Sequence, residues 1–167
     1  MAQHYQGVLV KEYLRDYAQN IWDTQKRKVS QEDIAPLISG QFQAQQQGLT
    51  SALEKTNHQS IAPVFMDTNL EQLAVYFTYY FGPSWGEIPQ QMTAEQDKIV
   101  YLLTRPDIPW QADDLRDRPL ERQGIFSIFK NYLDQKSLDY VVVDGAFEQR
   151  MTQACQFINK TWTQLYV

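Results

Sequence analysis

The chain has 167 residues, of which 43% are hydrophobic and 21% charged, and its formal net charge is −5. This composition is typical of one globular domain with a buried core, and the acidic balance argues against binding to nucleic acid or to anionic membranes. The single cysteine, Cys155, excludes an internal disulfide, and two histidines are too few for a Cys/His zinc set. No apolar run approaches the roughly 20 residues of a membrane span. The N-terminus lacks the apolar core of a secretion signal, so we expect a cytoplasmic protein.

Four short apolar runs predict buried strands, and the amphipathic stretches between them predict helices. In chain order, the expected strands are residues 7–10, 61–66, 99–103 and 140–143, and the expected helices are residues 12–22, 30–53, 68–81, 119–133 and 147–165. Ser30 and Thr68 are the expected N-caps of the second and third helices. The polar residues 105–118, which include two prolines, are expected to form a loop or lid with a helical turn.

The last helix has the clearest apolar face, on which Phe147, Cys155 and Trp162 are expected to be core residues. The frequent glutamines are expected on solvated helix surfaces. Arg122 and Arg150 are expected to be charges on the surfaces of their helices, although either could reach a phosphate.

Short apolar strands that alternate with helices predict an α/β fold, in which a parallel sheet is flanked by helices on both faces. Ligands of such sheets bind beyond the carboxyl ends of the strands. The charged residues expected at this edge are Glu12, Arg15 and Asp16 after the first strand, Asp67 after the second, and Asp107, Asp113, Asp114, Arg116 and Arg118 after the third. Carboxylates beside arginines suit phosphoryl transfer, because a carboxylate can orient a hydroxyl or hold Mg²⁺ and an arginine can neutralise phosphate charge. Solvated helix caps and surface ion pairs are the alternative interpretation.

Four segments of the chain are similar to motifs of one family. They are VKEYLRDY at residues 10–17, similar to E-Y-x-R-[DE]-Y; VFMDTN at 64–69, similar to a strand ending in D-T-[DN]; the helix end at 76–82; and IPWQADDLR at 108–116, similar to the lid motif [IT]-P-W-x-x-D-G-L-R. With these segments the sequence resembles the P-loop kinase domain of ribosylnicotinamide kinases of the NadR type and the related AAA-like ATPase domains. The resemblance covers nearly the whole chain, and it implies one kinase-like domain over residues 1–167 that is incomplete at its N-terminus.

The resemblance implies transfer of the γ-phosphoryl group of ATP, with Mg²⁺, to the 5′-hydroxyl of a nucleoside, nicotinamide riboside. It implies that Asp67 orients or deprotonates the hydroxyl or holds the metal, and that Glu12 contacts the riboside or a water on Mg²⁺. Arg15 and Asp16 would support the substrate pocket. Trp110, Asp113 and Arg116 would belong to the lid, where Arg116 would meet phosphate charge and Trp110 would cover a base or anchor the loop.

The chain departs from the family at the phosphate-binding loop. The family begins with a strand followed by G-x-x-x-x-G-K-[ST], whose backbone N–H groups and lysine hold the ATP phosphates, and this motif does not occur in the 167 residues. Three explanations stay open: a shortened chain or misplaced start, a degenerate paralogue, or a P-loop supplied by another chain. In each case we expect the chain alone to turn over ATP poorly or not at all.

Two other kinds of function stay open at this point. A non-catalytic nucleoside-binding or regulatory module would keep the acidic pocket without the phosphate grip. An acidic interaction protein with a superficial likeness to kinases would lack a parallel sheet. Because loss of the first strand would leave inner strand edges unpaired, a homodimer is an expected partner state.

Overall fold

The computed structural model describes residues 1–57, 62–93, 99–112, 115, 118 and 120–165, and for 163–165 it describes the backbone only. Its contacts divide the chain into two compact units, Met1–Ala94 and Glu95–Val167, which are described separately below. The single kinase-like domain expected from the sequence stays a prediction. Among the described helices, none combines the length and the apolarity that a membrane span requires.

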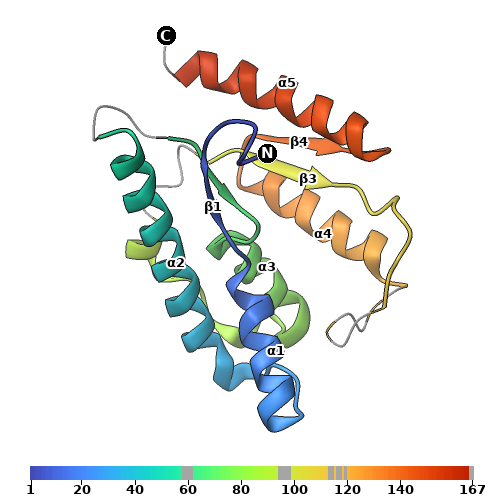
Figure 1. Cartoon of the computed structure of the whole chain (residues 1–167). Helices are drawn as coiled ribbons and strands as arrows, with labels where there is room; N and C mark the ends of the chain where they lie inside the picture. The colour runs from blue at the N-terminus through green and yellow to red at the C-terminus, as the bar shows by residue number, and fades with distance from the viewer. Residues whose placement is uncertain (58–61, 94–98, 113–114, 116–117, 119, 166–167) are drawn as a thin grey trace. The chain divides into compact units, whose positions relative to one another are not determined.

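The first unit contains two parallel strands and three long helices (Figure 1). Its elements are β1 (Val8–Val10), α1 (Tyr13–Gln25), a 3-10 turn (Gln31–Asp33), α2 (Ile34–Lys55), β2 (Val64–Met66), α3 (Leu70–Phe81) and two further 3-10 turns (Pro83–Trp85 and Gln90–Met92). In the ladder Val8 lies opposite Val64, and Val10 lies opposite Met66. The strands therefore run parallel, and their last residues, Val10 and Met66, lie side by side.

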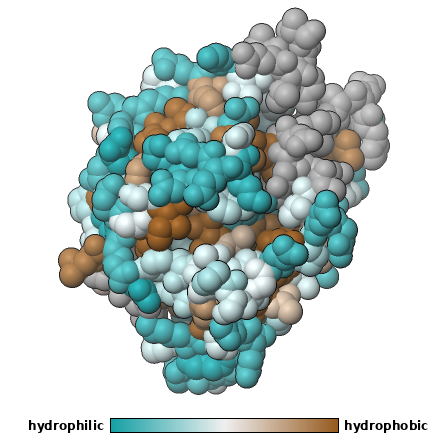
Figure 2. Space-filling view, turned by 180° about the vertical axis from the view of Figure 1, so that it is seen from behind, coloured by the Kyte–Doolittle hydropathy of each residue, from teal (hydrophilic) through white to brown (hydrophobic). Residues whose placement is uncertain are grey.

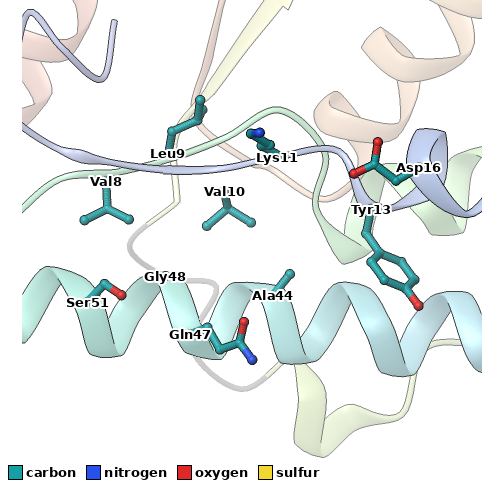
Figure 3. A pocket seen from close by; sticks show the side chains of 10 residues that line it. All are labelled: Val8, Leu9, Val10, Lys11, Tyr13, Asp16, Ala44, Gln47, Gly48 and Ser51. Atoms are coloured by element: carbon teal, nitrogen blue, oxygen red, sulfur yellow. The ribbon is translucent and has the colours of Figure 1, made fainter.

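Helix α2 packs directly against β1 because Gly48 leaves room for the strand. A Cβ atom at Gly48 would overlap the side chain of Val10, and one at Gly40 would overlap the ring of Tyr13. The side chains of Val8 and Val10 point toward α2, whereas Leu9 points away (Figure 3). The apolar core of this unit lies around α2 and α3, and its most buried members are Ile34, Leu37, Ile38, Leu70, Leu73 and Phe77.

The second unit also contains a parallel pair of strands (Figure 1). Its elements are β3 (Tyr101–Thr104), α4 (Arg122–Gln135), β4 (Tyr140–Val143) and α5 (Phe147–Leu165). Helix α4 packs against β3 and α5 packs against β4. Phe126, Leu133, Val143, Ala154 and Ile158 are its buried apolar residues.

The predicted fold class, an α/β arrangement of parallel strands and flanking helices, is confirmed, and every predicted strand and long helix has a counterpart. The described strands form two two-stranded sheets, β1–β2 and β3–β4, where the sequence predicted one sheet. The prediction that every strand is covered on both faces is wrong for β1, because Leu9 is 56% exposed. On the face drawn in Figure 2, hydrophobic side chains likewise reach the surface between hydrophilic ones.

Three predictions about single residues are corrected by the structure. The N-cap of α3 is Asn69, one residue after Thr68, since the Asn69 side chain accepts a hydrogen bond from the N–H of Gln72 at 2.9 Å. Phe147 is 71% exposed and Trp162 is also exposed, although both were expected in the core. The reason is length: the 19 residues of α5 span about 28 Å and the four residues of β4 only about 13 Å, so the strand cannot cover the whole length of the helix.

Candidate functional site

Two carboxylates lie at the carboxyl ends of the adjacent strands β1 and β2. Glu12 is the N-cap residue of α1, two residues after β1, and Asp67 directly follows β2. The N–H of Asp67 donates to the carbonyl oxygen of Val10 at 3.1 Å, which continues the ladder to the residue that carries this carboxylate. Parallel pairing therefore brings Glu12 and Asp67 to one edge, as predicted from the sequence.

Burial and a neighbouring negative charge raise the pKa of Glu12. Burial is the larger cause, and the charge of Asp67 is the second. Arg15 lowers the pKa of Glu12 and Asp16 raises it, so the three other site residues predicted in this unit all influence this carboxyl group. The hydroxyl group of Thr68 also lowers the pKa, although Thr68 Oγ1 has no hydrogen bond of regular geometry within the described residues.

Tyr76 of α3 belongs to the same cluster, and sequence reasoning gave it no role. Burial raises the pKa of its phenol, the charges of Glu12 and Asp67 raise it further, and Gln72 lowers it. Gln72 and Tyr76 are four residues apart, so they share one face of α3. The signal that could have identified Tyr76 is this four-residue spacing on the helix that follows Asp67.

Two glutamines of α2 hold the turn that carries Asp67. Gln41 Nε2 donates to the carbonyl oxygen of Thr68 at 2.7 Å, and Gln45 Oε1 accepts from the N–H of Leu70 at 3.0 Å. Gln41 is 0% exposed, so the prediction that the glutamines lie on solvated surfaces is wrong for this residue. Its position on the buried stripe of α2, three residues after Ile38, is the signal that the sequence offered.

The second unit contains the lid residues that the structure describes. Trp110 is 39% exposed there. Asp113 and Arg116 lie outside the described residues, so their predicted roles stay predictions. The base of the lid is fixed by Arg122, which donates to the carbonyl oxygen of Ile108 at 2.8 Å.

Arg150 of α5 fixes the lid at a second point. The sequence predicted it to be a charge on the helix surface, whereas in the structure its guanidinium is hydrogen-bonded. Its guanidinium donates to the carbonyl oxygens of Arg105, Val143 and Gly145 and forms an ion pair with Asp107. The N–H of Gly145 in turn donates to Asp107 at 2.7 Å, and this backbone bond is the main reason that the pKa of Asp107 is lowered. The ends of β3 and β4 are thus joined through one side chain, which is only 15% exposed.

The carboxylate pair has the right donors for a magnesium ion. Within the described residues no three His, Cys, Asp or Glu side chains come together as a metal cluster. Mg²⁺, however, is usually held by one or two carboxylates together with substrate phosphates and water. Glu12 and Asp67 fit this pattern, because two carboxylates that repel each other are stabilised by a cation between them.

A shallow hollow of about 290 Å³ lies between β1 and α2 (Figure 3). Lys11 and Asp16 are its charged residues, and neither Glu12 nor Asp67 lines it. Of the site residues predicted in this unit, only Asp16 lines the hollow, and the carboxylate pair lies outside it. This separation leaves the carboxylate pair, rather than the hollow, as the candidate active site.

Comparison with known proteins identifies a family. A protein-family model described as an AAA domain matches residues 1–150 of the chain. A search of curated proteins finds no match.

Proposed function

The chain belongs to the family of AAA domains, which have a P-loop NTPase-like fold, and from this premise we propose that it is a nucleoside phosphotransferase domain of the ribosylnicotinamide kinase type. P-loop domains generally bind ATP together with Mg²⁺. The proposed acceptor is the 5′-hydroxyl of nicotinamide riboside, as the resemblance of the sequence implies. The observation that carries the proposal is the approach of Glu12 and Asp67 at the ends of two parallel strands.

Asp67 is the proposed acceptor of the hydroxyl proton. As the hydroxyl oxygen forms its bond to the γ-phosphorus, the bond from that phosphorus to the bridging oxygen of ATP breaks and ADP leaves. The hydroxyl proton passes to the carboxylate of Asp67. Glu12 would bind the riboside beside it, with Arg15 and Asp16 supporting the pocket. Mg²⁺, held by Asp67 and Glu12, would supply neutralisation of phosphate charge when bound.

The lid residues complete the proposal. Arg116 would meet the charge of the transferring phosphoryl group, and Asp113 would bind substrate. Trp110 would cover the base. Arg122 and Arg150 support this assignment, because both fix the backbone or side chains from which the lid begins.

A second candidate function is a non-catalytic nucleoside-binding or regulatory module. It is favoured by one observation, which is that G-x-x-x-x-G-K-[ST] does not occur in these 167 residues. The P-loop provides most of the positioning and charge stabilisation in this chemistry. Such a module would bind the riboside and would not bind ATP.

Binding measurements on the full chain test the acidic site. We expect nicotinamide riboside to raise the melting temperature, and Asp67→Asn to weaken its binding roughly tenfold or more, because a charged hydrogen bond is lost. Asp23→Asn is the matched control, since Asp23 lies on α1 and its carboxylate accepts from Gln19 in an exposed pair. Equal riboside binding by the wild type and Asp67→Asn would contradict the proposed site.

A measurement of ATP–Mg²⁺ binding to the same chain separates the two candidate functions, and a coupled kinase assay measures turnover beside it. We expect little or no turnover with riboside and ATP–Mg²⁺. Riboside binding together with ATP binding supports the phosphotransferase, and riboside binding without ATP binding supports the module. Robust turnover that Asp67→Asn abolishes would establish catalysis and overturn the expectation that this chain is inactive alone.

A further inference from the structure

We propose that Gln41 and Gln45 are positioning residues, which fix the backbone of residues 67–70 and thereby hold the Asp67 carboxylate beside Glu12. This inference deepens the proposed function and rests on it for what Asp67 binds. That the two glutamines fix the turn follows from their hydrogen bonds alone, whatever Asp67 binds.

The two glutamines bind the turn in different ways, one as a hydrogen-bond donor and the other as an acceptor. Gln41 donates to the Thr68 carbonyl, and Gln45 accepts from the Leu70 N–H. They are four residues apart on α2, so both reach the same turn from one helix face. Thr68 and Leu70 are each 1% exposed, so water cannot replace either amide. Without the glutamines, a buried carbonyl and a buried N–H would lose their partners.

The contacts of the turn leave little freedom to Asp67. Its own N–H belongs to the ladder with Val10, and two residues later Asn69 caps α3 through the N–H of Gln72. The glutamine contacts fix the two peptide groups between these points, which join Thr68 to Asn69 and Asn69 to Leu70. A carboxylate placed within a few tenths of an ångström requires such a supporting shell.

Gln41 is a costly choice for packing alone. It occupies the buried stripe of α2, where Leu37, Ile38 and Ala52 are apolar, and its Oε1 has no hydrogen-bond partner within the described residues. An apolar side chain would avoid this buried unpaired oxygen. The amide is therefore explained by its donor, which binds the turn beside Asp67.

Binding of Mn²⁺ to the full chain, followed by electron paramagnetic resonance, tests the role toward Asp67. We expect Gln41→Leu to weaken Mn²⁺ binding about 10–100-fold, as is typical when a residue supporting a metal ligand is removed. Gln43→Leu makes the same change at an exposed glutamine of α2 and should change the affinity less than about twofold. In an Asp67→Asn background, Gln41→Leu should have no further effect, because its action passes through Asp67. An equal loss in both backgrounds would overturn the proposal.

Amide hydrogen exchange provides a readout that needs no ligand. Gln45→Leu should speed exchange at Leu70, and Gln45→Glu should restore protection, because glutamate keeps the accepting oxygen. Unchanged exchange at Leu70 in Gln45→Leu would overturn the proposal. If the wild type and Asp67→Asn bind Mn²⁺ equally, the metal role in the proposed function fails, and the exchange data then decide the role of the glutamines by themselves.

Discussion

Asp33 is a buried carboxylate that accepts five hydrogen bonds. It accepts hydrogen bonds from both terminal nitrogens of Arg27, from the hydroxyl of Tyr17 and from the N–H and hydroxyl of Ser30. The reciprocal bonds with Ser30 form a capping box, and Ser30 is the N-cap residue that the sequence pattern predicted. Asp33 is 3% exposed, so this carboxylate joins α1 to the start of α2 from within the first unit.

These bonds give the stability of the first unit a defined pH dependence. Arg27 is the main cause that holds the pKa of Asp33 well below its usual range, and burial opposes it. Because the folded pKa lies below the unfolded value of about 3.9, stability from this group is present above that pH and is lost as the pH falls further. We expect Asp33→Asn to lower the free energy of unfolding at pH 7 by about 1–3 kcal/mol.

Urea denaturation from pH 7 to about pH 3 checks this expectation, since the linked contribution is lost progressively below about pH 5. The difference between wild type and Asp33→Asn should shrink as the pH falls. Asp23→Asn, in an exposed pair with Gln19, is the control and should show a small difference at every pH. A loss for Asp33→Asn that stays constant with pH would contradict the charge argument.

At the same scale, the sequence predicted the acidic half of the site and missed its support. Glu12 and Asp67 could be predicted because strand ends of a parallel sheet share an edge, whatever the exact strand bounds. The roles of Gln41 and Tyr76 were missed, because they depend on what each helix face contacts. Helical spacing could single out both residues, but their partners become visible only in the packed structure.

At the scale of elements, apolar periodicity was sufficient to predict the strands and helices. It was not sufficient to predict which faces of these elements are covered by neighbouring elements, as the exposed side chains of Leu9 and Phe147 show. A strand with three apolar residues looks buried on both faces, and a helix face looks continuous, but neither pattern states where the neighbouring element ends. The number of strands in each sheet was missed for the same reason.

Two helix glycines provide a matched test of this packing. Gly48→Ala should lower the free energy of unfolding by about 1–3 kcal/mol, because its Cβ would overlap Val10 of β1. Gly124→Ala in α4, where a Cβ meets no atom within 4 Å, should instead stabilise by up to about 1 kcal/mol through helix propensity. Thermal unfolding of both variants measures this. Stabilisation by Gly48→Ala would show that α2 and β1 are not in close contact.

At the scale of the whole molecule, each described sheet has two strands, so each strand has one edge with which no described strand pairs. The first sheet protects one of them. The N–H of Val8 points to Pro63 within the ladder, so the Gly7 carbonyl of the same peptide group points to the other edge of β1. Lys55 Nζ donates to that carbonyl at 3.1 Å. A lysine at an edge disfavours pairing there, which leaves the edge of β2 for a partner strand.

We therefore expect the chain to associate with a second copy in solution. Two-stranded sheets are marginal by themselves, and a strand of a second copy could add to the edge of β2 with which no described strand pairs. Light scattering during size-exclusion chromatography should give about twice the 19.6 kDa of one chain. A mass of one chain that is constant with concentration would contradict this expectation.

The contacts of Arg150 have a practical consequence for how the protein can be shortened. The family match ends at residue 150, yet α5, which carries this guanidinium and packs against β4, continues to Leu165. A version that ends at residue 150 would keep Arg150 but lose most of α5, the helix that carries it. We therefore expect a shortened version to need α5 in full to keep these contacts of Arg150.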